Sequence, residues 1–72
     1  MPKLPVISGK EAIKVAQKLD FQIIRQRGSH IILRNEQNKR LVIPLHKSLK
    51  PGTLLQIIKT LGISKEKFEE LL

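Results

Sequence analysis

The apolar positions of the chain first recur with helical spacing, directly after a helix-capping signal. Ser8-Gly-Lys-Glu11 has the spacing of a capping box, in which the serine and glutamate side chains each accept a hydrogen bond from a free backbone N–H. Behind it, the positions i, i+3, i+4 and i+7 are held by Ala12, Val15, Ala16 and Leu19. This single apolar stripe predicts an amphipathic helix over residues 9–19.

Three short segments with strand character follow, separated by Gly28-Ser29 and by the polar stretch 35–39. They are rich in β-branched and aliphatic residues and cover residues 21–27, 30–34 and 40–45. Connections this short cannot carry the crossover that a parallel pair needs, so we predict an antiparallel meander. Pro44 has no N–H to donate to a ladder, and we expect it at the end of its strand or on a sheet edge.

A second helical pattern begins at Pro51 or Gly52 and ends at Gly62, where glycine is a common helix stop. Its apolar stripe consists of Leu54, Ile57, Ile58 and Leu61. Ser64 then caps a short third helix that returns Phe68 to the core. The predicted fold class is therefore α+β, with the order α-β-β-β-α and a short extra C-terminal helix in one domain spanning residues 1–72. A three-stranded antiparallel sheet with the helices on one face buries both stripes and leaves the other face exposed.

Composition narrows the class of protein. A chain of 72 residues with 40% apolar and 28% charged residues folds around one small core, without room for a deep cofactor pocket. The absence of cysteine excludes a disulfide framework, a zinc ribbon and a thiol nucleophile. The apolar runs are far shorter than a membrane span, and residues 1–7 lack the apolar stretch of a signal peptide. We expect a cytoplasmic protein that uses no cofactor.

The charge of the chain points to a polyanionic partner. The formal net charge is +8, and between residues 25 and 50 a single acid, Glu36, stands against a set of bases. These bases are Arg25, Arg27, Arg34, Lys39, Arg40, Lys47 and Lys50. Such a basic segment on a compact domain is typical of a nucleic-acid binder. A solubilising surface or an acidic protein partner is also consistent with it.

Few residues are suited to chemistry. The chain has no glycine-rich phosphate loop, no HExxH motif and no Cys/His cluster, and His30 and His46 have few acids nearby, so we expect no metal site. The only aromatic residues, Phe21 and Phe68, lie at apolar periodic positions and are expected in the core. A single-strand reader that stacks bases on aromatic side chains is therefore disfavoured.

His30 follows a Gly28-Ser29 turn inside the basic segment. An imidazole both takes and gives a proton near neutral pH, so it can abstract the proton of a ribose 2′-hydroxyl or protonate a leaving 5′-oxygen. RNA carries its own nucleophile, so this cleavage needs neither a metal nor a covalent intermediate. Ser29 and His30 are neighbours that would point to opposite faces of a strand, and are not a nucleophile–base pair. The alternative is that His30 is an ordinary strand residue hydrogen-bonding across the turn.

The phosphate-binding candidates lie on both sides of this turn. Arg25 and Arg27 share one face by strand alternation, Arg34 can join them across the hairpin, and Ser29 lies in the turn itself. Guanidinium groups suit the negative charge that develops on a phosphate during cleavage.

A second basic group precedes the second helix. Lys47 and Lys50 can hold a phosphate together with the free backbone N–H groups of the helix N-terminus. His46 either braces this loop or supplies the second half of an acid–base pair.

Several stretches together resemble one protein family. They are Ser8-Gly-Lys-Glu11, Gly28-Ser29-His30, Val42-Ile-Pro44-Leu-His46, Lys50-Pro-Gly-Thr-Leu54 followed by Ile57-Ile58, and Gly62-Ile63-Ser64 with Phe68. In this order and spacing the chain resembles the HicA (YcfA-like) toxins of HicAB toxin–antitoxin systems, which are small mRNA interferases. The resemblance implies a fold like the double-stranded-RNA-binding domain, a catalytic His30, an mRNA substrate and a HicB antitoxin that covers the active site.

The residues themselves leave two other functions open. A non-catalytic double-stranded-RNA-binding module would have the same charge and fold but would leave RNA intact. A protein-interaction module would bind an acidic partner through the basic segment and would ignore RNA at modest salt.

Overall fold

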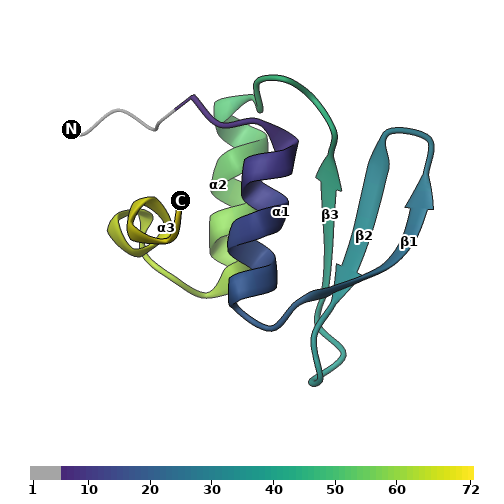
Figure 1. The fold of residues 1–72 in the computed structure, drawn as a ribbon. Coiled ribbons are helices and arrows are strands. Elements are labelled where there is room, and N and C mark those ends of the chain that lie inside the picture. The colour runs from purple at the N-terminus through teal and green to yellow at the C-terminus, as the bar shows by residue number, and fades with distance from the viewer. Residues whose placement is uncertain (1–5) are drawn as a thin grey trace.

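The computed structural model describes residues 6–72 of the chain. The elements are α1 (Gly9–Lys18), β1 (Gln22–Arg27), β2 (His30–Arg34), β3 (Arg40–Pro44), α2 (Pro51–Leu61) and α3 (Lys65–Leu71). Figure 1 shows this order as a helix, a three-stranded sheet and two further helices. The predicted fold class and element order are confirmed. The expectation about a signal peptide falls largely on residues 1–5, which lie outside the described residues.

The predicted bounds of α1 and β1 are each wrong by one residue, and one local motif accounts for both. Asp20 has a φ of 68°, and the chain leaves α1 there through a left-handed residue. The Asp20 N–H donates to the Gln17 carbonyl (3.1 Å) and the Phe21 N–H donates to the Ala16 carbonyl (3.0 Å). These two bonds form a Schellman motif, with aspartate in place of the usual glycine. Because the N–H of Phe21 closes the helix, the strand begins one residue later.

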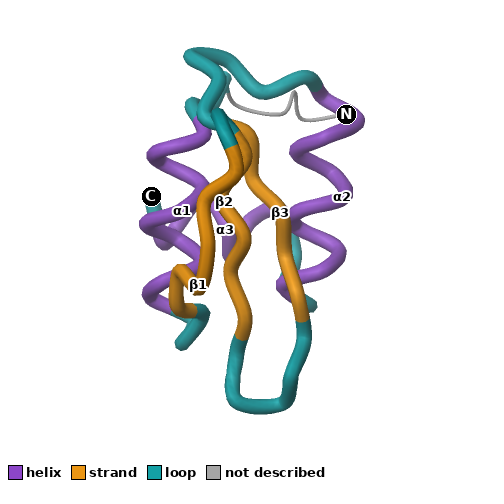
Figure 2. The backbone as a smooth tube through the Cα atoms, turned by 90° about the vertical axis from the view of Figure 1, so that its right-hand side faces the viewer, coloured by secondary structure: helices purple, strands orange, loops and turns teal. Residues whose placement is uncertain are grey.

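The sheet is antiparallel in the order β1-β2-β3, with β2 in the centre. Figure 2 views the open side of this sheet, with α1 and α2 behind the strands. Pro44 ends β3 on the free edge, as predicted, and the strand therefore stops one residue before the expected Leu45.

Strand alternation divides the sheet into an inner and an outer face. Residues of β2 and β3 that point to the helices are buried: Ile31, Leu33, Leu41 and Ile43. They meet the stripes of α1 and α2, and both Phe21 and Phe68 are buried in the same core, as predicted. The intervening residues of both strands lie on the outer face, which none of the helices α1, α2 and α3 covers.

Strand β1 stands apart from the helical layer. All six of its residues are exposed, whereas α1 and α2 both pack on β3. The pairing of β1 with β2 shifts between Ile23 and Arg25, so Ile24 forms a bulge in the edge strand. In Figure 1 the β1–β2 hairpin accordingly projects away from the helices.

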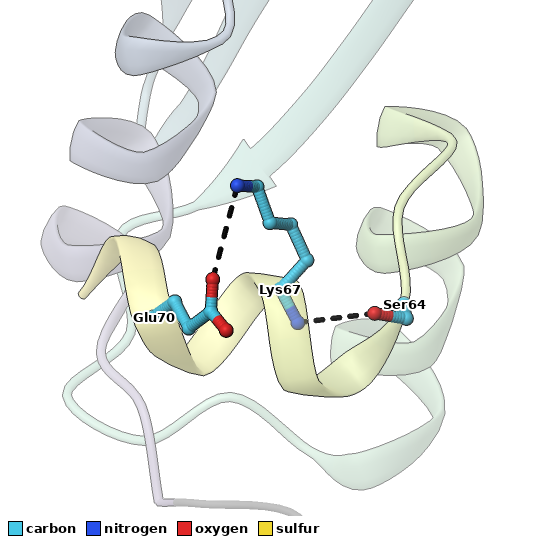
Figure 3. Close-up of polar contacts among 3 residues, drawn as sticks. All are labelled: Ser64, Lys67 and Glu70. Carbon is cyan, nitrogen blue, oxygen red and sulfur yellow. Dashed lines mark hydrogen bonds and ion pairs between the residues drawn. The ribbon is translucent and has the colours of Figure 1, made fainter.

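Side chains cap the N-termini of α1 and α3, and a glycine ends α2. Ser8 and Glu11 form the predicted capping box, and the hydrogen bond from the Ser8 backbone holds the pKa of Glu11 below its ordinary value. Gly62 ends α2 with a φ of 72°, as its predicted role requires. At α3 the Ser64 hydroxyl accepts from the Lys67 N–H (3.0 Å), and Lys67 also pairs with Glu70 at 3.8 Å (Figure 3).

Within residues 6–72, no helix has both the length and the apolar character needed to cross a bilayer.

Candidate functional site

The Gly28-Ser29 turn is a two-residue hairpin loop between β1 and β2. Arg27 and His30 are paired across it, and Gly28 has a φ of 57° while Ser29 does not have a positive φ. Glycine at the first central position is typical of a type II′ turn, whose twist suits an antiparallel hairpin. The glycine therefore allows the tight turn that places His30 at the very start of β2.

Hydrogen bonds on both sides hold this turn. The Ser29 carbonyl accepts from the Leu45 N–H at 2.7 Å, which ties the turn to the chain just beyond β3. The Gln26 side chain donates its Nε2–H to the Gly28 carbonyl at 3.0 Å. The backbone around His30 is thus fixed by the turn, by β1 and by β3.

His30 is exposed and lies on the outer face of the sheet. It directly precedes Ile31, whose side chain is buried on the inner face, so alternation directs His30 the other way. Its partners across the sheet are Arg27 on β1 and Pro44 on β3. The imidazole therefore faces solvent and is outside the hydrophobic core.

Two arginines of β1 lie beside His30 on this face. Arg27 is directly opposite His30, and such paired residues have Cβ atoms about 4.5–5.5 Å apart. Arg25 is paired with Ile32 and is thus the diagonal neighbour of His30, at about 7–8 Å. Both distances are within reach of a guanidinium group.

Arg34 lies on the same face but at its other end. It is four residues beyond His30 along β2, which corresponds to about 13 Å. Its partner on β3 is Arg40, a residue that sequence reasoning did not include among the candidate site residues. The signal was present in the alternation of residues 40–44, but only the register shows that Arg40 lies opposite Arg34.

The arginines of this face have no acidic partner within the described residues. The one ion pair of residues 6–72 joins Lys67 and Glu70 in α3, on the helical side of the molecule. The positive charge of the outer face is therefore available to an external anion.

His46 lies in the loop between β3 and α2, and its backbone braces that loop. The His46 carbonyl accepts from the Gly9 N–H at 2.9 Å, and the Leu49 N–H donates to the Ile7 carbonyl at 2.8 Å. A Cβ on Gly9 would collide with the carbonyl of Pro44, so the start of α1 is packed directly against the end of β3. The imidazole of His46 is exposed beside a small cavity of about 190 Å³ that Ser8, Lys10, Leu45 and Lys47 also line.

The remaining candidates lie at the same end of the molecule as the hairpin turn. Ser29 is an exposed turn residue, Lys47 is exposed in the loop, and Lys50 is the exposed N-cap of α2 without a side-chain capping bond. Figure 1 shows the Gly28-Ser29 turn and the loop before α2 together at the upper end of the sheet. The structure thus brings together His30, Arg25, Arg27 and Ser29, with the His46–Lys50 loop beyond them, and leaves Arg34 at the far end.

The fold and the site define a class of protein. This is a small basic α-β-β-β-α domain, like the double-stranded-RNA-binding domain in topology, with a solvent-facing histidine beside arginines of the neighbouring strand that pair with no acid of residues 6–72.

Comparison with protein families gives a more specific assignment. Residues 9–63, which run from the start of α1 to just beyond α2, match the family described as HicA toxin of bacterial toxin-antitoxin, and the chain therefore belongs to this family. It is a toxin of a toxin–antitoxin system, and an antitoxin is its partner. The comparison with curated proteins finds no match.

Proposed function

We propose that the protein is a metal-independent endoribonuclease, an mRNA interferase, that acts as a single domain and uses His30 as general acid or base. The neutral imidazole would take the proton of a ribose 2′-hydroxyl, and the 2′-oxygen would attack the adjacent phosphorus. The bond from phosphorus to the 5′-oxygen then breaks, and the leaving oxygen takes up a proton. The products are a 2′,3′-cyclic phosphate and a 5′-hydroxyl.

The observation that carries this proposal is the place of His30 on the outer face, exposed, with Arg27 directly opposite it and Arg25 diagonal to it on β1. General acid–base catalysis needs an imidazole that the substrate can reach. Stabilising the transition state needs positive groups aimed at the phosphate whose charge increases. Arg25 and Arg27 are suited to this second requirement, because neither is paired with an acid within residues 6–72.

RNA would extend from this face towards the His46–Lys50 loop. Ser29, Lys47 and Lys50 are exposed there, and the first backbone N–H groups of α2 lie beside Lys50. Arg34 would contact a phosphate at the other end of the outer face.

His46 is the candidate for the second proton transfer. Pro44 is paired with His30, and His46 is two residues further along the chain, so both imidazoles lie at one end of the sheet. The hydrogen bond from Gly9 to the His46 carbonyl engages only the backbone and leaves the imidazole free for this role.

We further propose that a HicB-type antitoxin silences the toxin by covering the outer face. Family membership supports an antitoxin partner. The position of His30 on an open surface supports inhibition by occlusion, since any protein seated on this face would exclude RNA from the imidazole.

The test uses end-labelled RNA and purified protein in the presence of EDTA. We expect cleavage to continue in EDTA and to disappear when the 2′-hydroxyls are replaced by 2′-O-methyl groups, because the substrate then lacks its nucleophile. Cleavage that stops with EDTA, or that continues on the methylated RNA, would contradict the mechanism.

The same experiment examines a non-catalytic double-stranded-RNA-binding module, which the fold also favours. That function predicts retention of duplex RNA in a shape-dependent way, with the labelled strands remaining intact.

A further inference from the structure

The centre of the outer face is apolar, although its surroundings are basic. Ile32 on β2 and Val42 on β3 are paired across the two strands, on the side opposite the buried Ile31 and Ile43. Val42 remains 49% exposed, so this apolar surface is open to a partner. We refer to Ile32 and Val42 as the apolar row.

Basic side chains surround the apolar row on the same face. Arg25 is paired with Ile32 on the β1 side, and the Arg34–Arg40 pair lies at one end of the row. At the other end are Arg27 and His30. Within residues 6–72 none of these bases forms an ion pair. An apolar centre with a charged rim is the usual organisation of a protein–protein interface.

The apolar row continues into a groove at the edge of the sheet. Val42 and Leu41 of β3 form one wall and Thr53 and Ile57 of α2 form the other, around a volume of about 420 Å³. A volume of this size can hold one or two side chains from a partner that sits on the outer face.

The chemistry of the apolar row favours a protein over RNA. Proteins that read RNA on a sheet surface stack the bases on aromatic side chains, and both aromatic residues of this chain are buried in the core. Branched aliphatic side chains offer no stacking surface but do provide a site for an aliphatic anchor. The basic side chains around the apolar row favour a partner that has carboxylates around this anchor.

We propose that the apolar row and its groove are the docking site of the antitoxin, which would present an aliphatic or aromatic side chain ringed by Asp and Glu. This inference rests on the proposed occlusion of the site and specifies how it is achieved. His30 is in the row of residues next to Ile32 and Val42, so a partner anchored on them covers the imidazole without having to contact it directly. The toxin would then use its arginines for phosphate when free and for carboxylates when inhibited.

The test compares Val42→Lys with a matched control, Leu55→Lys. Leu55 is 42% exposed on α2, does not line the groove, and receives the same change of charge. The probe is the purified protein encoded by the reading frame adjacent to that of this chain. We expect Val42→Lys to raise its dissociation constant at least about tenfold, as loss of an interface anchor does, and Leu55→Lys to change it less than about threefold.

RNA binding by the same two variants shows whether the apolar row binds the antitoxin or RNA. An added lysine strengthens contact with phosphates, so Val42→Lys should bind RNA as tightly as the wild type or more tightly. The proposal is wrong if Val42→Lys and Leu55→Lys bind the antitoxin equally well. It is equally wrong if Val42→Lys loses affinity for RNA alone, because the apolar row would then belong to the RNA site.

Two further readouts keep the result interpretable. Val42→Thr keeps the shape and strand preference of valine, and should give a smaller loss of antitoxin affinity in a fold that circular dichroism shows to be intact. Cleavage of RNA by each free variant separates the two proposals. Suppose that Val42→Lys weakens antitoxin binding but that neither the wild type nor any variant cleaves RNA. This result would support the docking site and contradict the proposed ribonuclease activity.

Discussion

The inner and outer faces of the sheet are made by the same strands but have different roles. In β2, Ile31 and Leu33 are buried against the helices, whereas His30, Ile32 and Arg34 point to the open side. The inner face therefore contributes the burial that stabilises the fold. The outer face is not needed for this and can hold charged residues and the apolar row. In a domain this small, with one sheet and one core, alternation along a strand is enough to separate stability from function.

The largest effect expected from this comparison is on stability. Leu33 is fully buried, and Leu33→Ala should lower the free energy of unfolding by about 2–5 kcal/mol, since the cavity adds to the lost transfer free energy. Its neighbour Ile32 faces outward, so Ile32→Ala should cost less than about 1.5 kcal/mol. Urea unfolding of both variants measures the difference. Equal losses would show that the two faces are not distinct.

A second prediction concerns the contact that joins the helical layer to the end of β3. Gly9→Ala should destabilise the protein by about 1–3 kcal/mol, because the added Cβ meets the Pro44 carbonyl and the backbone must shift. Gly52→Ala in the first turn of α2 is the control, since nothing lies within 4 Å of a Cβ there. It should be neutral or slightly stabilising. Thermal unfolding compares the pair, and a stable Gly9→Ala protein would contradict the close approach.

A third prediction concerns charge on the outer face. Arg25→Ala and Arg27→Ala should weaken RNA binding broadly across sequences, and each should reduce the slope of log affinity against log salt by about 0.7–0.9. Lys59→Ala removes an exposed base on α2 and should leave the slope unchanged. Titrations at several salt concentrations give the slopes. An unaltered slope for both arginine variants would exclude them as phosphate ligands.

The smallest effect is expected at the cap of α1. The pKa of Glu11 is lowered in the folded protein by the Ser8 backbone, so the folded state binds this proton less readily than the unfolded state. The resulting stabilisation is present above the unfolded pKa of about 4.5 and is lost as the pH falls through the lower, folded value.

Glu11→Gln removes this titration and reports its size. Melting temperatures at pH 6 and pH 3 should differ slightly less in the variant than in the wild type, with RNA cleavage at neutral pH unchanged. A steeper acid dependence in the variant would contradict the sign.

Most of the fold could be predicted from local signals in the sequence. The Ser8–Glu11 capping box, Gly62 and the two apolar stripes define the helices through interactions within a few residues. Strand alternation also predicts that Arg25 and Arg27 share a face. These features depend on near neighbours in the chain and can be predicted without the tertiary structure.

What the sequence did not reveal depends on contacts between distant residues. The bulge at Ile24 is set by the pairing of β1 with β2, and the exposure of β1 by where the helices pack on the sheet. The distance of Arg34 from His30, and the meeting of Arg34 with Arg40, follow from the register of β2 and β3. The close packing of Gly9 on Pro44 joins residues 35 positions apart, so no local sequence pattern predicts it.

The most direct test of the account is RNA cleavage by His30→Ala, measured with an unfolding curve and antitoxin binding on the same sample. We expect a loss of cleavage of about 10²–10⁴-fold, the usual contribution of a general acid or base, with stability retained because His30 lies outside the core. The antitoxin should still bind. Cleavage at the wild-type rate by a folded His30→Ala protein would contradict the assignment of the outer face as the catalytic surface.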